Sequence, residues 1–313
     1  TTRVGLQGGM SRGGRVTKHR IQLAWVLLVY CPNTTPEERG VRMNDTNTVA
    51  APTFISLDEA AALGEGTRIT FVPGVQALYA EALKNICFVK NIPVIRALHP
   101  MMGVDKETGE DRQRRLFELT SQTSLPTMFY NDERPRNVWI EQLALAERIG
   151  GADSPALIPA DFEQRAQMLG LCAVVLGEDG LVWNMRIMND GPLGRKYGYS
   201  DEASAAAPGK VAEVIALLDR QLHKQAERGS KYLIGDAVTA ADVYWATMSM
   251  CVTDTPPEIM PATQQNQGML KFFAANSKVP AIAEVHTSRV QEHQHYILTT
   301  YCETPAVLGG NPL

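Results

Sequence analysis

The spacing of apolar residues changes near the middle of the chain. Before residue 150, residues 68–72 and 93–99 form short β-rich runs bounded by turn residues, which predicts two strands. Residues 75–90 between them carry an apolar stripe at helical spacing. Because strand–helix–strand units have a right-handed crossover, the two strands are expected to be parallel. Beyond residue 160 the helical spacing dominates, which predicts helices at 162–175, 181–188, 211–225, 240–250, 268–275 and 282–299.

Three more segments complete the first half of the pattern. Residues 109–119 have the spacing of a short surface helix, and residues 123–131 form a third β-rich run that contains Leu125-Pro126. Residues 135–149 again have helical spacing, and residues 150–159 are a linker by composition. The order of elements is therefore strand, helix, strand, short helix, strand and helix.

The sequence predicts two domains after a leader. Residues 67–150 form the expected α/β domain. Residues 151–313 form the expected all-helical domain, in which residues 191–209 are a long loop rich in Gly, Ser and Ala. Ordered structure is expected to begin near Arg68, so residues 1–66 are interpreted as a disordered or non-native leader.

The first 42 residues differ from the rest in charge. They contain seven Lys or Arg and two Glu, a net charge of +5, which leaves −9 for the remainder of a chain whose total is −4. Their basic cluster precedes an apolar run at residues 21–30, an order that also fits a signal peptide, but no small-x-small cleavage site follows. We favour a disordered leader or a non-native extension, with Met43 as the natural start.

Composition argues against several partners. A net charge of −4 disfavours nucleic acid and anionic membranes, and no apolar run approaches the roughly 20 residues of a membrane-spanning helix. The five cysteines are scattered and form no Cys-x-x-Cys, which favours free thiols in a reducing, cytoplasmic setting. His293 and His295 diverge on a helix, so no metal site is expected.

A helix start near residue 239 is the most specific local feature. Thr239 followed by Asp242 has the form of a capping box, and Val238 and Val243 occupy the positions of a hydrophobic staple. The following helix is apolar almost all round, so it should be central and buried. The stretch Tyr-Leu-Ile-Gly-Asp-x-x-Thr-x-Ala-Asp at residues 232–242 resembles the capped core helix of glutathione S-transferases.

This resemblance implies a fold and an activity. The implied fold is a thioredoxin-like N-terminal domain followed by the all-helical C-terminal domain of the superfamily. The implied protein is a cytoplasmic homodimer that uses glutathione as its cofactor and transfers it to a small hydrophobic electrophile. Two alternatives stay open. One is a catalytically silent binding module, and the other is a glutathione-dependent lyase or isomerase with residues 191–209 as a substrate lid.

The resemblance also implies where a thiol would be activated. The family places a Tyr, Ser or Cys donor at the first strand–helix turn, where it lowers the pKa of the bound thiol. Here that turn spans residues 70–77, and Phe71 in it has no hydroxyl. Gln76, Tyr79 and, provided that it faces the site, Thr70 are the candidate substitutes, although Tyr79 also fits the packing face of its helix and Gln76 could simply be solvated.

Glutathione itself is implied to bind at two places. Leu125-Pro126 stands where the family has a cis proline, whose preceding backbone pairs with the peptide like an added strand. Arg136 and Asn137 stand where the family has an acidic residue and Ser that hold the γ-glutamyl end. Arg136 reverses that charge and suits an anionic ligand; alternatively, the pair is a solvated first turn of a helix.

A second substrate is implied to lie between the domains. Trp183, Arg186, Tyr197 and Tyr199 could line its pocket, because ligand pockets are mostly apolar with a few polar groups. The alternative is that these side chains belong to the core of the helical domain.

Overall fold

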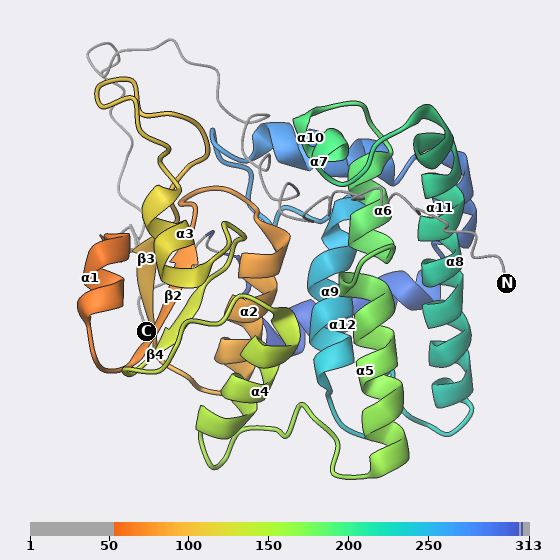
Figure 1. The fold of residues 1–313 in the computed structure, drawn as a ribbon. Helices are drawn as coiled ribbons and strands as arrows, with labels where there is room; N and C mark the ends of the chain where they lie inside the picture. Colours follow the sequence, from red (N-terminus) through yellow and green to blue (C-terminus); the bar gives the residue numbers. More distant parts are fainter. Residues whose placement is uncertain (1–52, 307, 309–313) are drawn as a thin grey trace, which may run out of the picture.

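A small β-sheet with its covering helices forms one side of the molecule, and a bundle of helices forms the other (Figure 1). The computed structural model describes residues 53–306 and 308. Residues 1–52 of the expected leader, including Cys31, lie outside the described residues.

The sheet contains the predicted parallel unit. Its strands are β1 (Phe54–Ile55), β2 (Thr67–Phe71), β3 (Val94–Leu98) and β4 (Met128–Tyr130), in the order β1-β3-β2-β4. Strands β2 and β3 are parallel, as expected from the crossover rule, and β4 runs antiparallel to β2. The Leu125–Pro126 peptide that leads into β4 is cis, as the resemblance implies.

Ordered structure begins earlier than predicted. Strand β1 pairs with β3, and α1 (Leu57–Ala62) follows with a capping box between Ser56 and Glu59. The prediction that order starts near Arg68 is therefore wrong. A strand of two residues is too short to produce an alternating pattern, so the capping box was the only local signal.

Arg68 ties this early segment to the sheet. Its side chain is buried, and its Nε donates to the Ala60 carbonyl at 3.1 Å, while Nη1 and Nη2 donate to the Gly66 and Asn131 carbonyls at 2.7 and 3.0 Å. A buried cation of this kind is tolerated because its donors are hydrogen-bonded. Arg68 thus connects α1, β2 and the end of β4.

Helices cover both faces of the sheet. Helices α1 and α3 (Arg114–Thr120) pack on one face through a small apolar cluster that includes Leu57, Leu116 and Phe129. Helices α2 (Leu78–Val89) and α4 (Trp139–Ile149) lie toward the helical domain (Figure 1). Both begin later than predicted. For α4 the reason is that the Arg136 backbone pairs with Met128 and continues the extended chain.

The second domain is all-helical, as predicted. Its elements are α5 (Phe162–Leu176), α6 (Leu181–Ile187), α7 (Pro192–Lys196), α8 (Asp201–Ala226), α9 (Ala240–Met248), a 3-10 turn (Ser249–Val252), α10 (Gln267–Asn276), α11 (Pro280–Val285) and α12 (Ser288–Tyr301). Residues 162–187 contain a stretch that is long and apolar enough to cross a membrane, but 56% of this stretch is buried in the protein. Packing against α8 and α9 accounts for this burial.

The prediction of a long loop at residues 191–209 is wrong. Helix α7 and the first two turns of α8 occupy most of this segment. Ser200 caps α8 by accepting from the Ala203 N–H at 3.1 Å, and the alanines that follow are the strongest helix formers. Pro208 lies inside α8. The substrate lid expected from this segment is therefore not a loop.

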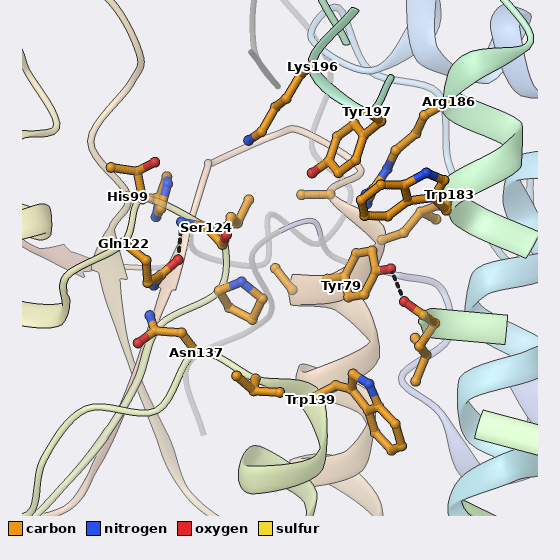
Figure 2. Close-up of a pocket in the computed structure, with 18 of the residues that line it drawn as sticks. Tyr79, His99, Gln122, Ser124, Asn137, Trp139, Trp183, Arg186, Lys196 and Tyr197 are labelled. Atoms are coloured by element: carbon orange, nitrogen blue, oxygen red, sulfur yellow. Dashed lines mark hydrogen bonds between the residues drawn. The ribbon is translucent and has the colours of Figure 1, made fainter. Parts of the chain in front are cut away.

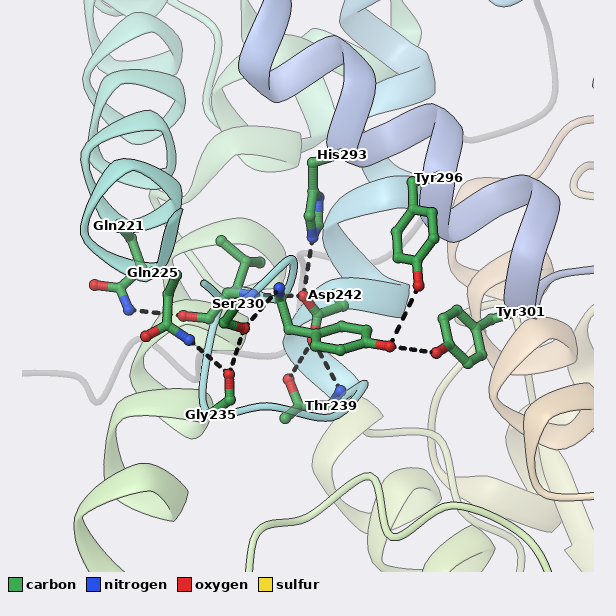
Figure 3. Close-up of polar contacts among 11 residues, drawn as sticks. Gln221, Gln225, Ser230, Gly235, Thr239, Asp242, His293, Tyr296 and Tyr301 are labelled. Carbon is green, nitrogen blue, oxygen red and sulfur yellow. Dashed lines mark hydrogen bonds and ion pairs between the residues drawn. The ribbon is translucent and has the colours of Figure 1, made fainter. Parts of the chain in front are cut away.

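Helix α9 is central and buried, and Asp242 in its first turn is the hub of a polar network (Figure 3). The Asp242 carboxylate accepts from the Thr239 N–H and hydroxyl, both at 2.8 Å, and from the Leu233 N–H at 2.7 Å. His293 Nε2 of α12 lies 2.9 Å from Asp242 Oδ1. The carboxylate thus joins α9, the preceding turn and α12.

The four described cysteines are buried and free, as expected, and burial raises the pKa of each thiol. They are Cys87, Cys172, Cys251 and Cys302.

Candidate functional site

A cavity of about 420 Å³ lies between the two domains (Figure 2). The sheet domain contributes the start of α2, the Leu125–Pro126 segment and the start of α4. The helical domain contributes the end of α5, part of α6 and the end of α7. Each wall comes from an element terminus or connection, where side chains and backbone groups remain accessible to a ligand.

Seven of the residues predicted from the sequence meet in this cavity. The sheet domain contributes Tyr79, Leu125, Pro126 and Asn137. The helical domain contributes Trp183, Arg186 and Tyr197. They lie up to 118 positions apart in sequence, so the two-domain fold brings them together.

Three predicted site residues lie outside the cavity lining. Gln76 is buried, and its amide Nε2 lies 3.6 Å from Met250 Sδ of the helical domain. Arg136, whose backbone pairs with Met128, forms an ion pair with Glu133 at 2.5 Å. Tyr199 donates to Asp201 Oδ1 at 3.2 Å beside the start of α8.

The first strand–helix turn presents no hydroxyl donor to the cavity. Phe71 is buried, and the Tyr79 hydroxyl donates to the Leu176 carbonyl of α5 at 2.6 Å. Tyr79 is therefore engaged in docking the two domains. The start of α2 does line the cavity, and the N–H groups of a first helical turn favour negative charge.

The helical domain supplies two cations. The Arg186 guanidinium lies 5.0 Å from the Tyr79 ring centroid and 4.2 Å from that of Tyr197. Lys196 Nζ lies 5.4 Å from the Tyr197 centroid, and burial, together with repulsion from Arg186, lowers the pKa of Lys196 to about 8. With an arginine and a lysine side by side, this wall is positively charged at neutral pH.

The opposite wall is polar but neutral. His99 lines this wall. Burial and the charge of Lys196 lower the pKa of the His99 imidazole to about 4, so the ring is neutral at neutral pH. Gln122 bonds to the Ser124 backbone, and Asn137 Nδ2 donates to Thr127 Oγ1 at 2.7 Å. The latter contact orients the Asn137 amide at the cavity edge.

Sequence reasoning missed His99, Gln122, Ser124 and Lys196. Only Ser124 carried a signal, its position directly before Leu125-Pro126. Within residues 53–306 and 308, no group of three or more His, Cys, Asp or Glu side chains is placed to hold a metal ion.

Comparisons with known proteins give structural likeness alone. No protein-family model and no curated protein matches the chain. It is similar to a tau class glutathione S-transferase from mango (12% identity, 74% of this chain and 96% of that chain covered, TM-score 0.46). It is also similar to a β-etherase from Sphingobium, with 16% identity, 70% of this chain and 98% of that chain covered, and a TM-score of 0.45. A third similar structure is a glutathione S-transferase from Methylobacillus flagellatus solved with GSH bound, with 14% identity, 70% of this chain and 98% of that chain covered, and a TM-score of 0.46.

The fold follows from the structure's own features. The sheet contains a parallel β2–β3 pair with an antiparallel β4, the Leu125–Pro126 edge faces the second domain, and the capped α9 lies at the centre of the helical bundle. The described residues therefore form a thioredoxin-like α/β domain followed by an all-helical domain, which is the fold predicted from the sequence.

Proposed function

We propose that this protein binds glutathione in the cavity between its domains and conjugates it, through its sulfur, to a small hydrophobic electrophile. The observation that carries the proposal is the composition of that cavity. It unites the positions at which the resemblance implies glutathione, Leu125, Pro126 and Asn137, with the aromatic side chains Trp183 and Tyr197 of the helical domain. A peptide and an aromatic molecule would meet there.

Glutathione binding would rest on the sheet domain. An extended peptide pairs with exposed backbone in a sequence-tolerant manner, and the Leu125 backbone would serve as that edge. Asn137 would contact the γ-glutamyl end, because an amide side chain both donates and accepts hydrogen bonds. Arg136 has no part in this proposal, since its side chain is paired with Glu133.

Thiol activation would come from the helical domain. The thiolate is the nucleophile, and a nearby cation lowers the pKa of a thiol. Arg186 lies beside Tyr79 at the start of α2, so it would face the sulfur together with the N-terminal N–H groups of that helix. Arg186 would therefore replace the hydroxyl that the turn lacks.

The reaction can be followed with a chlorodinitrobenzene. The thiolate attacks the ring carbon that bears chlorine, a C–S bond forms, the C–Cl bond breaks, and chloride leaves with the bonding electron pair. Calorimetric titration with glutathione and the absorbance of the conjugate test the two halves of the proposal separately. Glutathione binding with turnover supports it, and no binding at millimolar glutathione contradicts it.

Replacing Asn137 with Ala is expected to weaken glutathione binding by roughly tenfold, because one hydrogen bond to a charged ligand end is lost. The dissociation constant from calorimetry is the measurement. Gln264→Ala removes an exposed loop amide outside the cavity lining and should leave that constant unchanged. An unchanged constant in Asn137→Ala would remove Asn137 from the site.

Tyr79→Phe is expected to lower the free energy of unfolding by about 1 kcal/mol, because the bond to the Leu176 carbonyl is lost. Conjugation should stay within about twofold of the unsubstituted protein if the hydroxyl only docks the domains. Chemical denaturation and initial rates measure the two effects. Tyr199→Phe, which removes a hydroxyl outside the cavity, is the matched control. A large loss of rate at unchanged stability would instead assign Tyr79 a catalytic role.

A binding module without conjugating activity is the second candidate. The observation in its favour is that neither Phe71, Gln76 nor Tyr79 presents a donor to the cavity. Failure of the protein to bind immobilised glutathione would favour this candidate. Binding without turnover of chlorodinitrobenzene would favour a glutathione-dependent lyase or isomerase. The homodimer and the cytoplasmic location stay predictions from the sequence.

A further inference from the structure

Lys196 extends from the end of α7 over the cavity toward the sheet domain (Figure 2). Its ammonium is close enough to His99 to depress the pKa of that imidazole on the opposite wall. Lys196 therefore lines the cavity between the two domains, near the Tyr197 ring and on the same wall as Arg186.

This part of the cavity has an excess of positive charge. Glu178 is the single carboxylate among the described lining residues, and it is exposed at the end of α5. Among the described residues, no carboxylate forms an ion pair with the Lys196 ammonium, and the nearby Arg186 is a second cation. A partly buried ammonium without a counter-ion is unfavourable, so an anion bound beside it would be stabilised.

The surroundings of Lys196 also favour a flat ligand. Trp183 and Tyr197 meet edge to face with ring centroids 4.8 Å apart and an interplanar angle of 78°. Such a pair offers one ring face and one ring edge to a third aromatic ring. Opposite them, Gln122 and Ser124 line the cavity with polar, uncharged groups that do not repel an anion.

We infer that the second substrate carries a carboxylate on a planar aromatic body. The carboxylate binds the Lys196 ammonium, and the ring lies against Trp183 and Tyr197. The inference rests on the proposed function for the reaction that follows binding, whereas the binding itself requires no glutathione. It narrows the co-substrate from any hydrophobic electrophile to an aromatic acid.

Binding is tested with two matched, unreactive probes, a dinitrobenzoate and the corresponding dinitrobenzamide, titrated calorimetrically into the glutathione-free protein. The benzoate is expected to bind about tenfold more tightly, because a charge-assisted hydrogen bond is present for the acid alone. Lys196→Gln should abolish that preference, and Lys196→Arg should retain most of it. Lys224→Gln removes an exposed charge elsewhere, on α8, and should keep the full preference. Thermal unfolding of each variant confirms that it is folded.

Turnover supplies the second measurement. With glutathione present, a chlorodinitrobenzoate should be conjugated with a KM about tenfold below that of the corresponding amide. In Lys196→Gln the KM values of the acid and the amide should be equal. In each case chloride leaves as the C–S bond forms. If glutathione fails to bind but the benzoate preference persists and depends on Lys196, the proposed function is wrong and the ligand class stands.

Three results would overturn the inference. The first is equal affinity of the unsubstituted protein for the acid and the amide. The second is an equal loss of affinity for both probes in Lys196→Gln, which would indicate a structural role. The third is a loss of affinity for glutathione alone in Lys196→Gln, with the affinities for both probes unchanged. That result would mean that Lys196 binds a carboxylate of the tripeptide, while the proposed transferase activity would stand.

Discussion

Replacing Asp242 with Ala is expected to lower the free energy of unfolding by about 4 kcal/mol, because a fully buried carboxylate with four polar contacts is removed. The Leu233 and Thr239 N–H groups then lose their acceptor, and His293 Nε2 loses its partner inside the protein. Each orphaned buried group costs about 1–3 kcal/mol, so the sum exceeds the loss of one ordinary hydrogen bond. Urea denaturation followed by circular dichroism measures the change.

A surface carboxylate provides the matched control. Asp58 pairs with Arg115 at 2.6 Å, but its side chain is 70% exposed, so Asp58→Ala should leave the unfolding midpoint nearly unchanged. Asp242→Asn should be almost as destabilising as Asp242→Ala, because an amide nitrogen replaces an acceptor oxygen. A destabilisation below about 1 kcal/mol in both Asp242 variants would show that α9 does not organise the helical domain.

Arg186→Met is expected to reduce kcat/KM for glutathione conjugation by about a hundredfold, since a preorganised charge at the developing thiolate is lost. The same change should raise the pKa of the bound thiol by about one unit or more, because an opposite charge at this distance favours the ionised form. The rising limb of the pH–rate profile should therefore move to higher pH. Steady-state rates across pH, together with the ultraviolet absorbance of the bound thiolate, measure both effects.

The variant Arg186→Lys separates charge from packing. Lys keeps the positive charge but lacks the planar group that stacks near the Tyr79 and Tyr197 rings. A profile close to that of the unsubstituted protein would support an electrostatic role for Arg186. An unshifted profile in Arg186→Met, with only a lower unfolding midpoint, would limit Arg186 to structure.

Much of the fold was predictable from local patterns. The parallel β2–β3 pair follows from two β-rich runs flanking a helical stripe, and α9 follows from the capping box of Thr239 and Asp242. Strand β1 was not predictable, because it is held by pairing with β3 rather than by its own pattern. The start of α8 was misread because its Gly, Ser and Ala content suggests a loop, whereas Ser200 caps a helix there.

The cavity-lining residues were predictable only where the position of a residue along the chain determines which way it faces in the fold. Leu125 and Pro126 follow from their place at the start of a strand, and both line the cavity. The sequence could not show that Gln76 and Arg136 lie outside the cavity lining, because the side chain of a turn residue or an extended residue can point to either side and tertiary packing decides which. Lys196 reaches the cavity from α7 only because the helical bundle packs beside the sheet domain.

The central claim is that the cavity between the domains holds glutathione with its sulfur near Arg186. A crystal structure of the protein with S-methylglutathione tests this claim most directly. The account predicts the tripeptide in extended form along Leu125 and Pro126, its γ-glutamyl end at Asn137 and its sulfur between the start of α2 and Arg186. The same ligand bound at any other place, or a cavity left empty at saturating concentration, would contradict it.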